Sequence, residues 1–369
     1  MAASKQPTIL VVGAGPVGLT AAVELTRRGF EPRVIDQGEG PAIESRALAV
    51  NPRSLEILEP SGASARMLAK GLKIARLNFW EWPRLVFTVP VSRLDHRFNF
   101  ILALPQDDTE RVLIDRLEEM GGAVEWGSAL TGLDASPGGA RATIERGGRT
   151  ETLEADILIG ADGAHSRVRK ALGIGFSGDT DDEDFGLADA ILSGPVHEDE
   201  VNVFRVEQGI FAMIPAGHGR FRLVTDQPDV LSAVPERYVV EKVAWQSRFR
   251  ISYRQVETYQ KGSVFLAGDA AHIHSPVGGR GMNLGIEDAA TLAWLIETGR
   301  TQEYTQRRRP VGAHVLRQTD AQTRLMTSRG VFATFLRRWV APFLLERDFV
   351  LKRLLPEMAG LAAAPPEWL

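Results

Sequence analysis

The chain of 369 residues contains no cysteine, and this absence excludes several kinds of chemistry. Disulfide frameworks, thiolate-ligated zinc, iron–sulfur clusters and cysteine nucleophiles all need a thiol. A chain without cysteine also suits a reducing compartment, so we expect a cytoplasmic protein.

Long apolar runs and a dominant charge are also missing. No run approaches the ~18 apolar residues of a membrane-spanning helix, and the apolar run after Thr8 enters a glycine loop without a signal-peptide cleavage site. The 43 Lys and Arg against 47 Asp and Glu give a formal net charge of −4. A nucleic-acid-binding protein would show a strong basic excess. We therefore expect small-molecule partners, no nucleic acid and no transmembrane segment.

The first informative feature is a strand–turn–helix–strand pattern near the N-terminus. Residues 8–12 form a short, mainly β-branched run without a polar face, as in a strand buried on both faces. They lead into Gly13, Gly15 and Gly18 in GxGxxG spacing, then into a helical stretch and a second strand that ends at Asp36. The glycines allow a tight turn and close approach of a pyrophosphate, which the helix N-terminus attracts. Asp36 would accept hydrogen bonds from ribose, which favours FAD or NAD over NADP.

Two further buried strands run into acidic turns. Residues 155–160 precede Asp162 and Gly163, and residues 261–267 precede Gly268 and Asp269. Ligands of open α/β sheets bind at the carboxyl ends of strands. A glycine-rich loop then enters a helix, whose N-terminus would stabilise negative charge on a ligand. Taken alone, the Asp162 turn favours a structural role. The Gly268–Asp269 turn, taken alone, favours a structural role and a ligand-binding role equally.

Together and in this order, the three motifs resemble the FAD-dependent aromatic hydroxylases, the flavoprotein monooxygenases typified by p-hydroxybenzoate hydroxylase. The phenol- and polyketide-hydroxylating branch looks closest. The resemblance extends over about residues 8–310 and includes Ser45–Ala47, Asn51–Glu56, and Gln106 with Glu110 and Leu113. It implies hydroxylation of an aromatic, phenolic or related small molecule with NADH or NADPH and O2, through a flavin C4a-hydroperoxide.

The resemblance also implies which residues bind FAD. Arg46 and Gln106 would touch its pyrophosphate and ribityl regions, Asp269 its ribityl chain, and residues 281–283 the pyrimidine edge. Pro276 would lie beside the isoalloxazine ring, and the Asp162 motif would serve both FAD and the nicotinamide donor. The full set of expected FAD contacts is Gly13, Gly15, Pro16, Gly18, Asp36, Arg46, Gln106, Asp162, Gly268, Asp269, Gly279, Gly281, Met282 and Asn283.

For the substrate we expect contacts from the β-rich segments around residues 201–225. Pro215, Arg222 and Pro276 are the candidates, and no side chain is nominated as a nucleophile or general base. Phe79, Trp80 and Trp82 would either stack on an aromatic substrate or pack in a core.

The predicted fold class is α/β, with a discontinuous Rossmann-type FAD-binding domain, an inserted β-sheet-rich substrate lobe and C-terminal helices. Many relatives of this branch carry a further C-terminal domain, where this chain has a short helical segment. The expected bounds are 1–75, 104–180 and 258–313 for the FAD-binding domain, 76–103 and 181–257 for the lobe, and 314–369 for the helical segment.

Other functions stay open on this evidence. A flavin-dependent halogenase or a reductase could use the same scaffold, although Trp80-Glu-Trp82 only superficially resembles the halogenase signature. A non-catalytic FAD-binding sensor is a third interpretation. His272 and His274 are two residues apart without an evident third ligand, so no metal site is expected.

Overall fold

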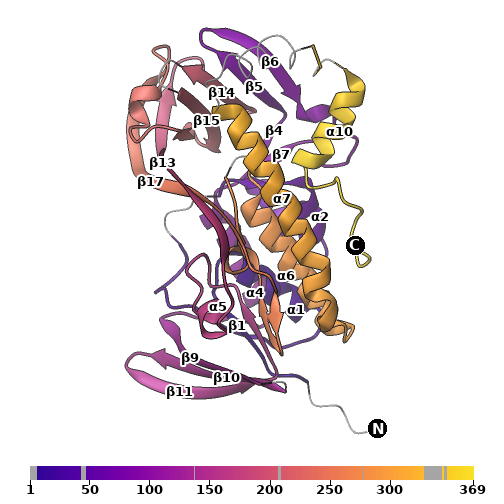
Figure 1. Ribbon diagram of the computed structural model, residues 1–369. Helices are drawn as coiled ribbons and strands as arrows, with labels where there is room; N and C mark the ends of the chain where they lie inside the picture. The colour runs from indigo at the N-terminus through magenta and orange to yellow at the C-terminus, as the bar shows by residue number, and fades with distance from the viewer. Residues whose placement is uncertain are drawn as a thin grey trace.

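The computed structural model describes residues 6–42, 47–136, 138–206, 209–276, 278–327, 343–344 and 347–369, without the side chains of residues 182, 183 and 325–327. Arg46 therefore lies outside the described residues. Figure 1 shows a helix-covered lower body, a β-rich lobe at its top, and the long helix α7 reaching from one to the other.

The body is built on a six-stranded sheet with β1 near its centre. β1 pairs in parallel with β12 and β2, and β12 pairs in parallel with β19, so three strands distant in sequence end at one edge. Their apolar residues are buried on both faces, as parallel strands require. The strand order is β18 (Gln260–Lys261), β19 (Val264–Leu266), β12 (Ile157–Gly160), β1 (Ile9–Val12), β2 (Arg33–Ile35), β8 (Val124–Glu125).

Helices cover this sheet, and α1 packs against both α6 and α4. A three-stranded antiparallel sheet, at the bottom of Figure 1, contributes Ala140, Ala142 and Ile144 to the same hydrophobic core. The elements are α1 (Pro16–Arg27), α2 (Pro52–Leu58), α3 (Ala63–Lys70), α4 (Gln106–Glu119), α5 (Arg167–Ala171) and α6 (Gly281–Glu297), with β9 (Ser128–Ser136), β10 (Gly139–Arg146) and β11 (Arg149–Ala155).

The lobe is an eight-stranded sheet in which the 17-residue strands β13 and β17 form a long ribbon toward the body. Its order is β20 (His272–Ile273), β17 (Val239–Gln255), β13 (Ser177–Ser193), β16 (Arg220–Thr225), β15 (Gly209–Gly217), β14 (Glu200–Val206), β5 (Arg76–Glu81), β6 (Arg84–Pro90). A small sheet of β3 (Ala49–Val50), β7 (Ile101–Ala103) and β4 (Leu72–Ile74) comes from residues on both sides of β5 and β6 in the sequence.

The C-terminal part contains α7 (Tyr304–Thr327) and α10 (Asp348–Met358). The α/β fold class is confirmed, with a Rossmann-type sheet assembled from distant segments and a β-rich lobe. The expected bound at 313/314 falls inside α7, and the domain bounds stay a prediction. Within the described residues, no helix has the length and apolar character needed to cross a membrane.

Candidate active site

The glycine loop after β1 combines two packing glycines with one that faces open space. A Cβ on Gly18 would lie 1.8 Å from the carbonyl oxygen of Gly13, and a Cβ on Gly13 would lie 2.4 Å from that of Ala161. At Gly15, by contrast, no heavy atom lies within 4 Å of an added Cβ. The protein itself therefore requires glycine at two of the positions, and the middle one leaves room for a ligand to approach the backbone.

The start of α1 is arranged to receive an anion. No side chain caps the helix, and its first turn carries no acidic residue. Pro16 begins the helix, where its missing N–H removes no helical hydrogen bond. The unpaired backbone N–H groups and the helix dipole thus favour a pyrophosphate at this end.

Asp36, at the end of β2, fixes the loop that a ribose would meet. Its Oδ2 accepts a hydrogen bond from the backbone N–H of Ala14 at 2.7 Å, and its Oδ1 accepts one from that of Gly38 at 2.7 Å. Each carboxylate oxygen can accept a second hydrogen bond. The carboxylate can therefore hold the glycine loop and accept from ribose hydroxyls together.

Gln106 begins α4 and contacts the protein rather than open space. Its Nε2 donates to Glu110 at 2.9 Å, its Oε1 accepts from the N–H of Ala47 at 3.4 Å, and its own N–H donates to the Ala47 carbonyl at 3.1 Å. Burial raises the pKa of Glu110, which also accepts from the N–H of Ala42. The expected FAD contact of Gln106 stays a prediction.

Asp162 brings an unsatisfied acceptor close to the glycine loop. Its Oδ2 accepts from the N–H groups of Arg167 and Val168 at 2.7 and 3.1 Å. Its Oδ1 is buried and has no hydrogen-bond partner among the described residues. Because the neighbouring Ala161 packs against Gly13, this orphaned oxygen is available to a bound cofactor.

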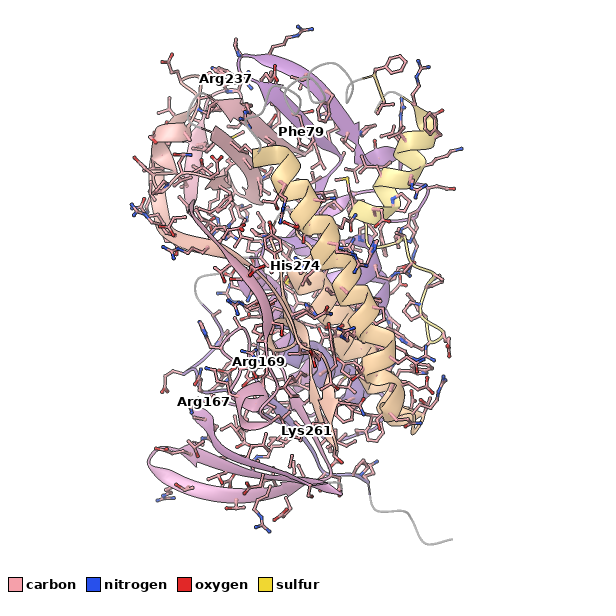
Figure 2. All side chains as sticks on the ribbon, viewed as in Figure 1. Phe79, Arg167, Arg169, Arg237, Lys261 and His274 are labelled. Atoms are coloured by element: carbon pink, nitrogen blue, oxygen red, sulfur yellow. The ribbon has the colours of Figure 1, made fainter. Side chains whose placement is uncertain are left out.

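Arg169 connects the turns that follow β12 and β19. Its guanidinium donates to the carbonyls of Ala270 and Ala164 at 3.0 and 2.9 Å, and lies 3.9 Å from the ring centroid of Phe176. Burial lowers the pKa of Arg169. Figure 2 shows Arg167 and Arg169 on the same helical turn.

A buried charge network, which sequence reasoning missed, supports the Gly268–Asp269 turn. The carboxylate of Asp288 accepts from His272 Nε2 at 2.6 Å, from Arg308 Nε at 2.6 Å and from the N–H of Gly268 at 3.2 Å. Burial acts to raise the pKa of Asp288, but the charges of Arg308 and His272 and their hydrogen bonds lower it overall. Asp269 itself is exposed at the start of the turn.

The loop before α6 is tied down by the side chain of Asn283. Its Nδ2 donates to the carbonyls of Ala49 and Gly279 at 2.8 and 2.6 Å, and its Oδ1 accepts from the N–H of Asn51 at 2.9 Å. These contacts use the amide, so the backbone of Gly281 and Met282 is what the helix N-terminus offers to FAD. No side chain caps α6 either.

His274 lies under this loop, at mid-height in Figure 2. Its Nδ1 donates to the Ser275 carbonyl at 2.9 Å, and a Cβ on Gly281 would lie 3.9 Å from its Cε1. Burial, with the charge of His272, lowers the pKa of His274 to about 4. The ring is therefore neutral at physiological pH. Pro276, two residues on, is exposed.

Arg222 on β16 is bound by the protein itself. Its Nε and Nη2 both donate to the carboxylate of Asp189 at 2.8 Å, and its Nη1 donates to the carbonyl of Ala47 at 3.3 Å. Both side chains are largely buried. The last contact joins this face of the lobe to the segment before β3, and the carbonyl of Ala49 in β3 in turn accepts from Asn283 at the start of α6.

Pro215 lies on the opposite face from Arg222. Ile214 pairs with Arg222 across the strands, whereas Pro215 pairs with Phe221, which is in the lobe's buried core. Trp80 and Trp82 pack against that same core. Phe79 instead stacks on Phe87 with 4.5 Å between ring centroids, and packs toward α10.

Comparison with known proteins decides the family. Residues 6–319 match the family described as FAD binding domain. The chain belongs to this family.

Several of its relatives are named monooxygenases. The chain is 35% identical to 6-methylpretetramide 4-monooxygenase from Streptomyces rimosus over 390 aligned positions, covering 96% of this chain and 69% of that protein. The OxyS anhydrotetracycline hydroxylase structure from the same organism superposes with a TM-score of 0.83 at 30% identity, over 98% of this chain and 77% of that chain. The structure of a p-nitrophenol 4-monooxygenase from Pseudomonas putida DLL-E4 shares the fold with a TM-score of 0.87 at 21% identity. The match covers 97% of this chain and 99% of that chain.

The protein is therefore an FAD-dependent aromatic monooxygenase that uses NAD(P)H and O2. Apart from Gln106, which begins α4, the expected FAD residues that the structure describes follow the carboxyl ends of β1, β2, β12 and β19 or lie at the N-termini of α1 and α6. Among the described residues, no group of three His, Cys, Asp or Glu side chains could hold a metal ion.

Proposed function

We propose that the substrate is an aromatic molecule without a carboxylate, bound between the Arg222 face of the lobe and the loop of residues 278–283. The FAD would lie along the glycine loop, Asp36 and Asp162, with its ring end toward Gly281 and Met282. When bound, FAD supplies the redox chemistry of the hydroxylation.

The observation that carries the proposal is the pairing of Arg222. An arginine that binds a substrate carboxylate must offer a free pair of N–H groups. In this protein Asp189 takes that pair, and a main-chain carbonyl takes a further N–H. Releasing Arg222 to a ligand would leave Asp189 buried without its partner, at a cost of about 3–5 kcal/mol.

The burial pattern of β15 and β16 supports the same face as the binding surface. Phe211 and Met213 on one face are fully buried, whereas Ala212, Ile214 and Val224 on the Arg222 face are only partly buried. Apolar groups left partly open toward the body suit an apolar ring system. Two relatives at 30% identity or more are named for 6-methylpretetramide and anhydrotetracycline, and we infer a substrate of that kind.

The chain's own residues would bind and orient the substrate and the flavin, and would shield them from water. Apolar residues of the Arg222 face would exclude water from the reacting ring, and backbone N–H groups at the start of α6 would face the flavin where negative charge develops. NADH and NADPH both stay candidates for the reductant, and a cytoplasmic location stays a prediction.

The test is substrate-stimulated NAD(P)H oxidation by the FAD-loaded protein, with mass detection of a product heavier by one oxygen. The test compounds are anhydrotetracycline and simple neutral phenols. The carboxylated compound p-hydroxybenzoate is the comparison. We expect stimulation and oxygenated product from anhydrotetracycline or the simple neutral phenols, which carry no carboxylate, and none from p-hydroxybenzoate. Coupled hydroxylation of p-hydroxybenzoate would contradict the proposal, and product formation that needs halide would indicate a halogenase.

A further inference from the structure

Residues 347–369 are here called the C-terminal segment. Its first contacts, in chain order, are with the lobe. Leu351 and Leu355 on α10 are buried in a small hydrophobic cluster with Val89 and Leu94, against which Phe79 also packs. All three lobe partners belong to β5, β6 or the turn that follows them. Figure 1 shows α10 beside β6 and the chain then descending past α2.

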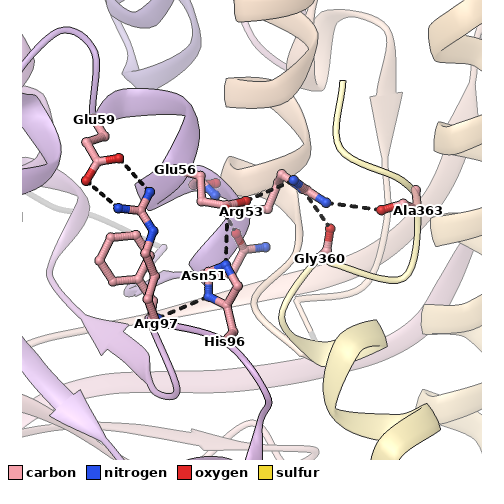
Figure 3. A network of polar contacts seen from close by, with 10 residues as sticks. Asn51, Arg53, Glu56, Glu59, His96, Arg97, Gly360 and Ala363 are labelled. Atoms are coloured by element: carbon pink, nitrogen blue, oxygen red, sulfur yellow. Dashed lines mark hydrogen bonds and ion pairs between the residues drawn. The ribbon is translucent and has the colours of Figure 1, made fainter. Parts of the chain in front are cut away.

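The end of α10 is then bound by Arg53 of α2, as Figure 3 shows. Its Nη2 donates to the Ala363 carbonyl at 3.0 Å, and its Nε donates to that of Gly360 at 3.4 Å. The backbone N–H of Arg53 donates to the carbonyl of Ala359 at 3.3 Å. The last carbonyls of a helix carry the negative end of its dipole, so a buried guanidinium is a favourable partner.

A second arginine reaches the same helix end from the loop before α6. Arg280 Nη1 donates to the carbonyl of Glu357, and Gln318 of α7 donates to the Glu357 carboxylate at 3.2 Å. Burial lowers the pKa of Arg280. Arg280 stands one residue before Gly281, so the C-terminal segment bonds directly to the loop that we expect to meet the flavin ring.

The segment finally attaches to the far side of the body. Glu367 pairs with Arg300 at 3.3 Å and with Arg307 at 3.0 Å, and the Trp368 ring lies 5.8 Å from the guanidinium carbon of Arg28. Along its length it therefore contacts the lobe, then the loop before α6 and α7, then α2, and finally α7 again and the end of α1.

We propose that the C-terminal segment is a brace that positions the loop of residues 278–283 through Arg280 and so sets how tightly FAD is held. Arg53 and Gly360 are its positioning residues: they dock the segment, and neither is among the expected FAD contacts. The proposal rests on the FAD contact of this loop, which the Gly281 variant described in the Discussion tests separately.

Two variants release the brace from opposite sides. Gly360→Ala places a Cβ 2.8 Å from Asn51 Nδ2 at a residue with φ +75°, so the segment must lift from α2. Arg53→Met keeps the apolar stem of the side chain and removes its guanidinium donors. Gly299→Ala is the matched control, because its φ of +67° gives similar backbone strain with no atom within 4 Å of the Cβ.

The measurements are hydrogen–deuterium exchange of the apoprotein and the Kd for FAD by flavin fluorescence. Both releasing variants should speed exchange in α10 and in residues 278–283, and raise the Kd about fivefold or more, the lower end of typical coupling between sites. The control should lower Tm without either effect.

Three results would overturn the proposal. Faster exchange in α10 with an unchanged Kd would make the segment a passive cover. Equal effects in Gly299→Ala would mean general destabilisation. Unchanged exchange in α10 in both releasing variants would show that these contacts do not hold the segment.

Discussion

The two neighbouring glycines at the start of α1 should respond to alanine in opposite ways. Gly15 has φ −73° and open space around its Cβ position, so Gly15→Ala fits the fold. The exchange of glycine for alanine at the residue that caps the helix costs under about 1 kcal/mol. The methyl group would, however, occupy the space through which a pyrophosphate reaches the backbone. Loss of one charge-assisted hydrogen bond, about 1.5–3 kcal/mol, predicts an FAD Kd raised at least about tenfold.

Gly18→Ala reverses the outcome, because its Cβ would lie 1.8 Å from the Gly13 carbonyl oxygen and α1 must move away from the turn. Overpacking of this kind costs about 1–3 kcal/mol or more, so the Tm of the apoprotein should fall by several degrees. Thermal unfolding of both apoproteins and FAD titration separate the two effects. A Gly15→Ala protein that binds FAD as tightly as the parent chain, or one that loses as much Tm as Gly18→Ala, would refute the reasoning.

Three further outcomes follow from the site. Asp36→Ala should weaken FAD binding by about 1–3 kcal/mol, since ribose loses a charged acceptor; unchanged FAD retention after dialysis would count against it. Asp288→Asn leaves Arg308 buried without a full counter-charge and should lower the free energy of unfolding by about 3–5 kcal/mol, checked by urea titration. Because burial holds the pKa of His274 near 4 in the folded chain against about 6.5 unfolded, stability present above pH 6.5 should fall by up to about 3 kcal/mol toward pH 4. His274→Leu should flatten that decline, and identical pH profiles would contradict this assignment.

The fold was predictable where short-range patterns decide it. Residues 8–36 follow a local rule, since an apolar strand, a glycine turn and a helix must meet within a few residues. The pairing of β1 with β12, nearly 150 positions away, followed only because each strand reads as buried on both faces. The C-terminal helical segment was expected to begin near residue 314, but α7 begins at Tyr304. Pro310 lies inside α7 and does not end the helix.

The charge networks could not be predicted from the sequence. Asp288, His272 and Arg308 come from α6, β20 and α7, and no spacing rule joins residues on three elements. Arg222 was expected to meet substrate, but its partner Asp189 lies opposite it in the pairing of β13 with β16. That register depends on tertiary packing of a strand whose first half is acidic.

Gly281→Ala tests whether the loop before α6 stabilises reduced flavin. Gly281 is the first residue of α6, and the nearest atom to its added Cβ is His274 Cε1 at 3.9 Å, an ordinary contact. The protein alone therefore accepts alanine there, and Tm should stay unchanged. Gly279→Ala is the structural counterpart, since φ is +61° and its Cβ would lie 2.8 Å from that of Ala49; it should lower Tm.

The redox consequence follows from the charge of the reduced ring. Reduction places negative charge near the helix N-terminus, where the dipole contributes about 0.3–2 kcal/mol. A methyl group at Gly281 would hold the ring away from the first N–H groups of α6. Loss of about 1 kcal/mol lowers a two-electron midpoint potential by about 20 mV, measurable by equilibration with a reference dye. A potential and an FAD Kd both unchanged in Gly281→Ala, beside a lowered Tm in Gly279→Ala, would mean that these glycines only shape the turn.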